Sequence, residues 1–137
     1  KPVRVIIPYA AGGGSDITTR IVQAKAMELL GQSLIVDNRA GGGTLIGTRM
    51  AQTAPADAYT VGVMDPAFII NPTLVKDAGY DSLKDFTPVT LITATPLILV
   101  SPPSFAPKTV QELVAWLKAR PGKVSYSSAG VSSARMR

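Results

Sequence analysis

The amino-acid sequence predicts an α/β fold in which a mainly parallel sheet is flanked by helices. Short runs of β-branched residues recur along the first half of the chain, and glycine-rich loops follow two of them. Apolar residues at helical spacing come after these loops, so strand, loop and helix repeat in order. The composition, with 46% hydrophobic and 17% charged residues over 137 positions, is typical of a folded domain and not of a disordered chain.

The first strand is expected over residues 3–7, where the sequence VRVII ends at a proline. A helix is expected to follow over residues 17–30, because isoleucine, valine and leucine recur there at helical spacing. Ser15 and Asp16 are the candidates for its N-cap, and Gly31 can adopt the left-handed conformation that ends a helix. The next expected elements, in chain order, are a strand at 33–37, a helix at 44–52, a strand at 59–64, a helical turn at 67–70 and a new helix that starts at Asn71 and Pro72.

The second half of the chain predicts two more strands, at residues 86–91 and 96–100. A proline-dense stretch at 101–107 then indicates a boundary between lobes. Thr109 and Glu112 match a capping box at the start of a helix, whose apolar face is formed by Val110, Leu113, Val114 and Leu117. A short strand is expected at 124–126. The predicted domains are therefore a first lobe at 1–100 and the start of a second lobe at 101–137.

Composition excludes several classes of function. The chain has no cysteine and no histidine, so a thiolate nucleophile, a disulfide and a histidine base are all excluded. The net charge of +5 comes from basic residues that are scattered singly, and aromatic residues make up only 6% of the chain. Nucleic-acid binding is not expected from this pattern, whereas a mild positive field suits an anionic solute.

Three loops are expected at the carboxyl ends of strands, which is the edge where open α/β sheets bind ligands. They are residues 9–16, 39–47 and 127–133. Glycines let a ligand approach the backbone, and a helix N-terminus offers free N–H groups to an anion. The alternative is that the glycines only permit tight turns, and for Gly47 close packing of a helix on the sheet is the favoured interpretation. For the third loop, the alternative is a solvated serine-rich tail.

Nucleotide binding and catalysis are not supported by the motifs. No lysine follows Gly14 or Gly43 as a phosphate-binding P-loop requires, and the glycines of 41–47 have the wrong spacing for a dinucleotide fingerprint. Asp16 and Asp65 could form a carboxylate pair, but Asp16 is expected as an N-cap and Asp65 as part of a proline turn. No enzyme activity and no cofactor are therefore predicted.

Several segments are similar to one known family. They are residues 1–9 with the following GGGSD of 12–16, VDNRAGGG at 36–43, PADAYT at 55–60, NP at 71–72, YD at 80–81, KDF at 84–86, PV at 88–89, KARPGK at 118–123 and YSSAG at 126–130. In this order they resemble the substrate-binding receptors of tripartite tricarboxylate transporters, often called Bug proteins. The resemblance extends along nearly the whole chain.

The resemblance implies a periplasmic-binding-protein-like (type II) lobe with an incomplete second lobe. It also implies a periplasmic solute-binding protein that captures small organic carboxylates for the membrane components of a tripartite transporter. Ligands of the family lie between two lobes and are held largely by backbone amides, hydroxyls and bridging waters. The ligand-binding positions implied here are Tyr9, Gly12, Gly13, Gly14, Ser15, Asp16, Asp65, Pro66, Ala67, Phe68, Ser127, Ser128, Ala129 and Gly130; no metal site is implied.

Two departures from the family pattern carry expectations of their own. Ala58 stands where the family has glycine, so a turn is strained if this position needs a positive φ. Residues 132–137 leave the pattern and the chain stops, so the sequence is expected to be a truncated receptor. Uncovered apolar faces would then favour self-association, and the lack of half the cleft wall would weaken ligand binding. The alternative function is accordingly a truncated receptor lobe that oligomerises and binds no solute.

Overall fold

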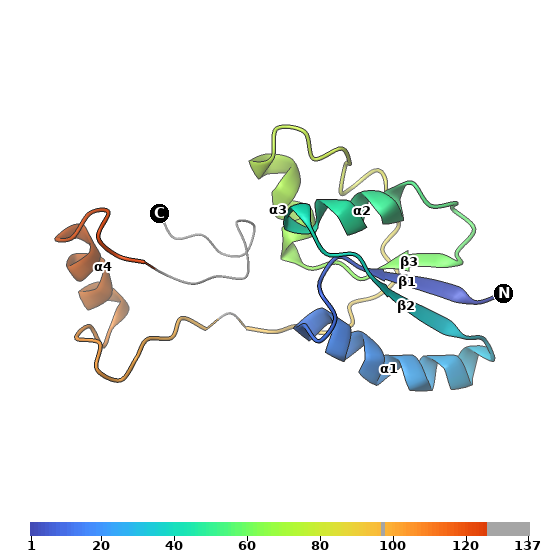
Figure 1. The fold of residues 1–137 in the computed structure, drawn as a ribbon, viewed down its shortest axis with the longest axis horizontal. Coiled ribbons are helices and arrows are strands. Elements are labelled where there is room, and N and C mark those ends of the chain that lie inside the picture. The colour runs from blue at the N-terminus through green and yellow to red at the C-terminus, as the bar shows by residue number, and fades with distance from the viewer. Residues whose placement is uncertain (97, 126–137) are drawn as a thin grey trace. The chain divides into compact units, whose positions relative to one another are not determined.

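The computed structural model describes residues 1–96 and 98–125 (Figure 1). Contacts between backbone positions divide them into two compact units, residues 1–93 and residues 94–125. Each unit is described by itself. The expected division after residue 100 stays a prediction.

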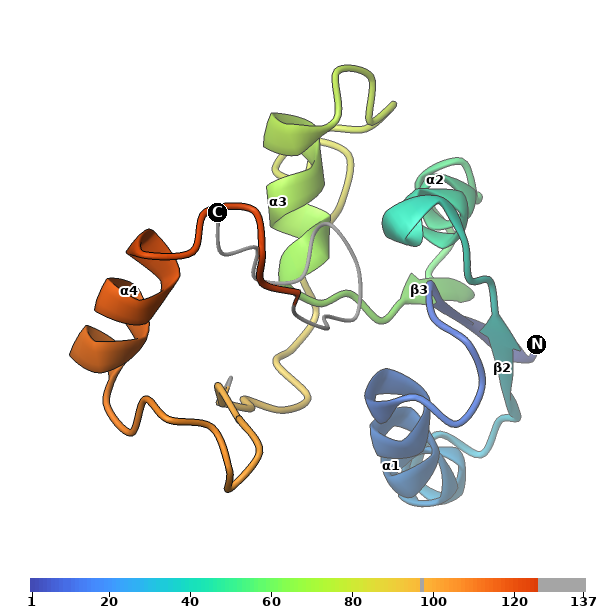
Figure 2. The same cartoon turned by 60° about the vertical axis from the view of Figure 1, so that its left-hand side comes forward.

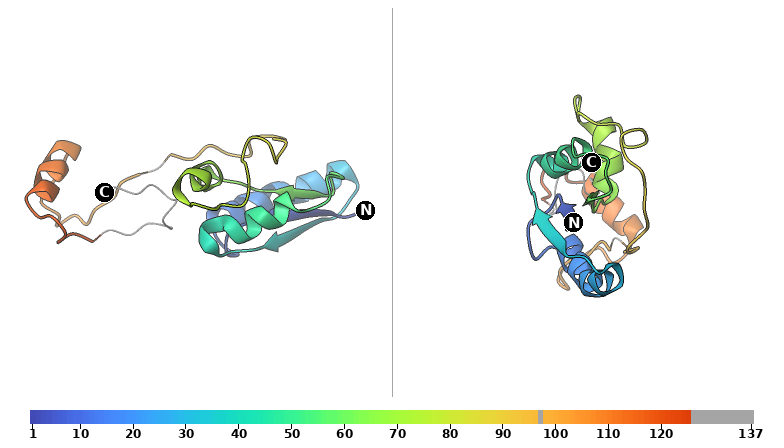
Figure 3. Two further views of the ribbon diagram at one scale, coloured as in Figure 1. Left: turned by 90° about the horizontal axis from the view of Figure 1, so that it is seen from above. Right: turned by 90° about the vertical axis from the view of Figure 1, so that its right-hand side faces the viewer.

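The first unit is built on a three-stranded parallel sheet. Its strands are β1 (Val3–Ile7), β2 (Leu34–Asn38) and β3 (Thr60–Gly62), in the order β2-β1-β3. Helices α1 (Gly14–Leu30) and α2 (Leu45–Gln52) lie on opposite sides of these strands, as Figure 1 and Figure 2 show. The side view in Figure 3 shows the same arrangement. The predicted α/β fold with a parallel sheet flanked by helices is confirmed.

The second half of the central strand is covered on both faces, which explains why three apolar residues follow one another there. Val5, Ile6 and Ile7 expose at most 3% of their surface. Successive residues of a strand point to opposite faces, so Val5 and Ile7 pack on one side and Ile6 on the other. The core of this unit is therefore centred on β1.

Helix α1 begins earlier than the sequence predicts. Its N-cap is Gly13, with no side chain capping it, so the expectation of Ser15 or Asp16 as the N-cap was wrong. The reason is that the Asp16 carboxylate accepts a hydrogen bond from the N–H of Gly12, outside the helix, and the helix gains a turn. Gly31 ends the helix with a φ of 61°, and its N–H donates to the carbonyl of Met27, as predicted.

A 3-10 turn η1 (Gly42–Thr44) leads into α2, close to the predicted helix at 44–52. Gly43 and Thr44 have φ values of 62° and 82°, a conformation that is costly for threonine. The buried side chain of Asn71 stabilises this turn, because its amide donates to the carbonyl of Gly43 at 2.8 Å and to the hydroxyl of Thr44 at 3.0 Å.

One continuous helix, α3 (Pro66–Leu74), stands where the sequence predicts a turn at 67–70 and a new helix at Asn71. That prediction was wrong because Pro72 lies inside the helix. Pro72 has no N–H for the carbonyl of Phe68, four residues earlier. The hydroxyls of Tyr80 and Ser82 donate to this carbonyl instead, at 2.9 and 2.8 Å. Two side chains from a later segment thus replace the missing helical hydrogen bond.

The residues described in the ranges 86–91 and 96–100 do not form the strands predicted there. Val124 and Ser125, in the third strand predicted in this half of the chain, do not form a strand either. Phe86 instead packs edge-on against Phe68, with ring centroids 4.9 Å apart, while Val89 and Leu91 expose 83% and 80% of their surface. Strand-forming composition indicates a local preference, but a strand needs a hydrogen-bonded neighbour.

Ala58 has a φ of 62°, so the strain expected at this position is confirmed. We expect Ala58→Gly to stabilise the fold by about 0.5–1 kcal/mol, because glycine adopts positive φ without a steric cost. Urea denaturation measures the change. Ala56, in the same loop and without a positive φ, supplies the control, and Ala56→Gly should leave stability unchanged or lower it. Equal effects of the two substitutions would contradict the explanation.

The second unit contains α4 (Val110–Lys118). The hydroxyl of Thr109 accepts the N–H of Glu112 at 3.2 Å, which confirms the predicted cap, although the carboxylate of Glu112 accepts the N–H of Lys108 and not that of Thr109. Trp116 packs against Phe105, with centroids 5.0 Å apart. Throughout the described residues, no helix has the length and apolar character needed to cross a membrane.

Candidate functional site

The loops that follow the three parallel strands lie at one edge of the sheet, because the strands run in the same direction. They comprise residues 8–13 after β1, 39–41 after β2 and 63–65 after β3. Two of the three loops predicted to bind ligand, 9–16 and 39–47, are therefore brought together at this edge. The third predicted loop, 127–133, lies outside the described residues.

Asp16 organises the loop after β1. It exposes 3% of its surface, and its carboxylate accepts the N–H of Gly12 at 2.8 Å. The guanidinium of Arg20, one helical turn later, donates to both oxygens at 3.0 and 3.1 Å. The amide of Asn38 donates to Asp16 at 3.2 Å and also to the carbonyl of Tyr9 at 3.2 Å. The loop is thus attached to helix α1 and to the end of β2.

These contacts also set the protonation state of Asp16. The hydrogen bonds from Arg20, followed by the N–H of Gly12, lower the pKa of its carboxyl below the ordinary value. The carboxylate therefore stays ionised, and keeps its partners, to a more acidic pH than a free aspartate would.

Tyr9 and Asp65 join the loop after β1 to the loop after β3. The hydroxyl of Tyr9 donates to one oxygen of Asp65, and the other oxygen accepts the N–H of Ala67 at 2.9 Å. Asp65 is thus the N-cap of α3, the role the sequence had led us to expect for Asp16. Burial and the hydrogen bond to Asp65 raise the pKa of Tyr9 well above its usual range, so this phenol stays neutral.

The guanidinium groups of Arg4, Arg20 and Arg39 are each paired with a carboxylate. Arg20 pairs with Asp16, and both Arg4 and Arg39 pair with Asp37. Three guanidinium groups share two carboxylates, so the ion pairs neutralise most but not all of their positive charge. An anion at this edge would use uncharged donors as well.

Backbone N–H groups at the start of α1 are the uncharged donors closest to the loop. The first N–H groups of a helix have no partner within the helix, and the helix dipole adds partial positive charge there. They belong to Gly14, Ser15 and Asp16, while the N–H of Ile17 already donates to the carbonyl of Gly13 at 2.9 Å. Gly12 and Gly14 are exposed. The arrangement can accept the negative end of a small solute.

The predicted site residues fall into distinct structural roles. Tyr9, the glycines of 12–14, Ser15 and Asp16 share one loop and helix start with Asp65 nearby, whereas Ala67 is buried and Phe68 packs against Tyr80. Ser127 to Gly130 lie outside the described residues. The assignment of all these positions to a ligand stays a prediction.

Sequence reasoning missed Arg20 and Asn38, although the spacing of Asp16 and Arg20 on one helix face gave a signal.

Gly47 has the packing role favoured from the sequence. An added Cβ would lie 2.7 Å from the Cα of Pro8 and 2.8 Å from the carbonyl oxygen of Arg39. Helix α2 therefore approaches the ends of β1 and β2 more closely than any residue with a side chain allows.

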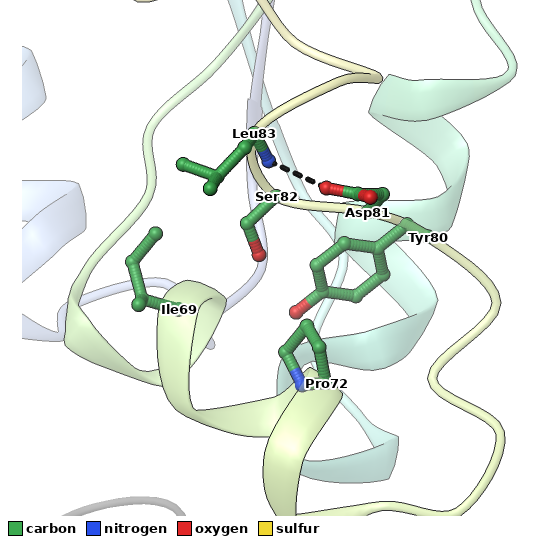
Figure 4. A pocket seen from close by; sticks show the side chains of 6 residues that line it. All are labelled: Ile69, Pro72, Tyr80, Asp81, Ser82 and Leu83. Carbon is green, nitrogen blue, oxygen red and sulfur yellow. Dashed lines mark hydrogen bonds between the residues drawn. The ribbon is translucent and has the colours of Figure 1, made fainter.

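A separate groove of about 320 Å³ lies between α3 and the segment after it (Figure 4). It is lined by Ile69, Pro72, Tyr80, Asp81, Ser82 and Leu83. None of the glycine-loop residues lines it, so it is distinct from the sheet edge described above. Within the described residues, no group of three acidic, histidine or cysteine side chains is placed to hold a metal ion.

Comparison with known proteins identifies one family. Residues 18–136 match the family described as "Tripartite tricarboxylate transporter family receptor". Protein BugT of Bordetella pertussis is 33% identical over 129 residues, which cover 93% of this chain and 40% of that protein. The chain likewise spans 40% of a Pseudomonas protein encoded in the tcbD-tcbE intergenic region, with 32% identity over 133 residues.

Two solved structures from Rhodopseudomonas palustris are similar in fold. One, determined with adipate, has a TM-score of 0.83 at 32% identity, and the match covers 96% of this chain and 44% of that protein. The other, MatC with bound malate, has a TM-score of 0.72 at 30% identity, and the match covers 86% of this chain and 40% of that protein. The chain thus corresponds to less than half of the length of these relatives.

Proposed function

The chain belongs to the tripartite tricarboxylate transporter receptor family, and from this premise we propose that it binds small organic carboxylates in the periplasm for uptake by a tripartite transporter. The membrane components of that transporter are its proposed partners. Its proposed role is capture of a solute and not catalysis.

The observation that carries this proposal is the start of α1, where exposed glycines precede free helical N–H groups at the ligand-binding edge of a parallel sheet. Because the guanidinium groups nearby are largely neutralised by carboxylates, backbone donors supply much of the attraction for an anion. The solved relatives that hold adipate and malate support carboxylates as the ligand class.

Binding rather than chemistry is supported by the state of the polar side chains. Tyr9 is neutral and its proton is engaged by Asp65, and Asp16 is saturated with donors. Neither group is poised to transfer a proton near neutral pH.

We expect adipate or malate to raise the melting temperature of the chain. Ligand that binds only the native state stabilises it by about 2.7 kcal/mol at a concentration of 100 times Kd. Differential scanning fluorimetry against a concentration series measures the shift. The diamide of adipate, which has the same length and no charge, serves as the control. Equal shifts with the acid and the diamide, or no shift with any carboxylate of a panel, would contradict the proposal.

A second candidate function is a self-associating lobe that binds no solute. It is favoured by apolar side chains that α1 leaves exposed: Ile17, Ile21, Leu29 and Leu30 expose 52%, 72%, 74% and 59% of their surface. Apolar surface of this kind tends to be covered by a partner. The thermal-shift experiment separates the candidates, since this one predicts no stabilisation by carboxylates.

A further inference from the structure

We infer that Asp16, together with Arg20 and Asn38, positions the first glycine loop for anion binding and does not itself contact the anion. The inference rests on the proposed function and assigns the roles of three residues within that site. Asp16, Arg20 and Asn38 are called the loop clamp below.

The first step is that Asp16 has no capacity left for a ligand. Both of its oxygens accept a hydrogen bond from Arg20, one also accepts from Gly12, and the other also accepts from Asn38. Its side chain is 4% exposed. A buried carboxylate would also repel the carboxylate of a solute. Asp16 must therefore contribute to the site through the groups that it binds within the protein.

What Asp16 holds is the turn of the loop. Gly12, whose N–H it accepts, has a φ of 82°, a conformation that glycine adopts without strain. An added Cβ at Gly12 would meet no atom within 4 Å, so glycine is required there by backbone conformation and not by lack of space. The hydrogen bond to Asp16 therefore selects one conformation of an otherwise permissive residue.

Asn38 connects this turn to the next strand. Its amide donates to the carbonyl of Tyr9 and to Asp16, and its oxygen accepts from the guanidinium of Arg20 at 3.4 Å. It is the last residue of β2. The loop clamp thus joins the first glycine loop, α1 and the end of β2.

Fixing the loop before a ligand arrives reduces the conformational entropy that binding would otherwise cost. Each hydrogen bond of the loop clamp to the Asp16 carboxylate is charge-assisted and hence stronger than an average one. We therefore expect Asp16→Ala to weaken carboxylate binding about tenfold or more, and Asn38→Ala by a smaller factor.

Asp57→Ala is the matched control. Asp57 also pairs with a basic side chain, Lys1 at 2.6 Å, and also accepts a backbone N–H, that of Tyr59 at 3.0 Å. It precedes β3 and so lies at the opposite edge of the sheet from the glycine loops. The two substitutions remove a similar set of hydrogen bonds from different places, but the side chain of Asp57 is 38% exposed against 4% for Asp16, so Asp57→Ala is expected to destabilise the fold less.

Three measurements on the wild-type chain and these variants test the inference. Calorimetry gives the affinity for adipate and malate, thermal denaturation gives stability, and NMR hydrogen exchange gives the protection of the Gly12 amide. The inference is supported if the Gly12 amide loses its protection in Asp16→Ala and this variant also loses affinity. Asp57→Ala should keep its affinity at a temperature where both variants are folded. Asp16→Asn, which keeps an acceptor for Gly12, should retain part of the affinity.

Unchanged protection of Gly12 in Asp16→Ala would overturn the positioning role, whatever the affinity. An affinity loss of the same size in Asp57→Ala, measured at a temperature where both variants are folded, would overturn it as well. If the wild-type chain binds neither acid while Gly12 is protected only in the presence of Asp16, the proposed function fails and the loop clamp stands as a determinant of loop conformation.

Discussion

Gly47→Ala is expected to destabilise the first unit by roughly 3 kcal/mol, because the added methyl group collides with atoms that cannot yield. Its Cβ would lie 2.7 Å from the Cα of Pro8 and 2.8 Å from the carbonyl oxygen of Arg39. Both belong to backbone that continues directly from strands β1 and β2, and the N–H of Arg39 donates to the carbonyl of Ile7 at 2.7 Å. Relief would require α2 to move away from the sheet. Urea denaturation measures the loss.

Gly14→Ala supplies the control for this prediction. Gly14 also lies in a helix, as the first residue of α1, but its added Cβ meets no atom within 4 Å. Stability of Gly14→Ala should match or slightly exceed that of the wild type. If the two variants denature at the same urea concentration, close packing of α2 is not the reason for glycine at position 47.

Asn71→Ala is expected to cost about 2–4 kcal/mol, the second large effect in this chain. The side chain is 2% exposed, and its amide is the donor for the carbonyl of Gly43 and the hydroxyl of Thr44. Removing it leaves the buried hydroxyl of Thr44 and the part-buried carbonyl of Gly43 without this partner and opens a small cavity. It also frees Thr44 to leave its strained conformation, with a φ of 82°. A lowered denaturation midpoint would report the loss.

The exposed hydrogen bond from Gln52 to Asp85, at 3.3 Å, provides the comparison. Gln52→Ala should change stability by no more than about 0.5 kcal/mol, since water replaces the lost partner. Near-equal effects of Asn71→Ala and Gln52→Ala would show that burial of Asn71 does not matter to the second glycine turn.

The sheet could be predicted because its signals are local. The second half of β1, Val5 to Ile7, is apolar because both faces are covered there, and the glycines after β1 and β2 mark where the chain turns back. The left-handed conformation of Ala58 was also foreseeable, since the resemblance showed glycine at that position. Patterns within a few residues were sufficient for each of these.

Other features depend on residues far apart in the sequence and were missed for that reason. Pro72 indicates the start of a helix unless a distant donor serves the carbonyl that it leaves unpaired. Asp16 has the composition of an N-cap, but its partners include Asn38, 22 positions later. At the site, sequence reasoning found the loop that carries the backbone donors and missed two side chains that hold it.

The carbonyl of Phe68, which has side-chain donors in place of a helical one, also affects how the molecule opens. Its two donors are 12 and 14 positions away, in a stretch with no regular structure, so α3 keeps its middle turn satisfied only while that stretch stays docked. Helix and stretch are therefore expected to lose their exchange protection together, as a single cooperative block. The irregular segment supplies hydrogen-bond donors to α3, just as a neighbouring strand supplies them in a sheet.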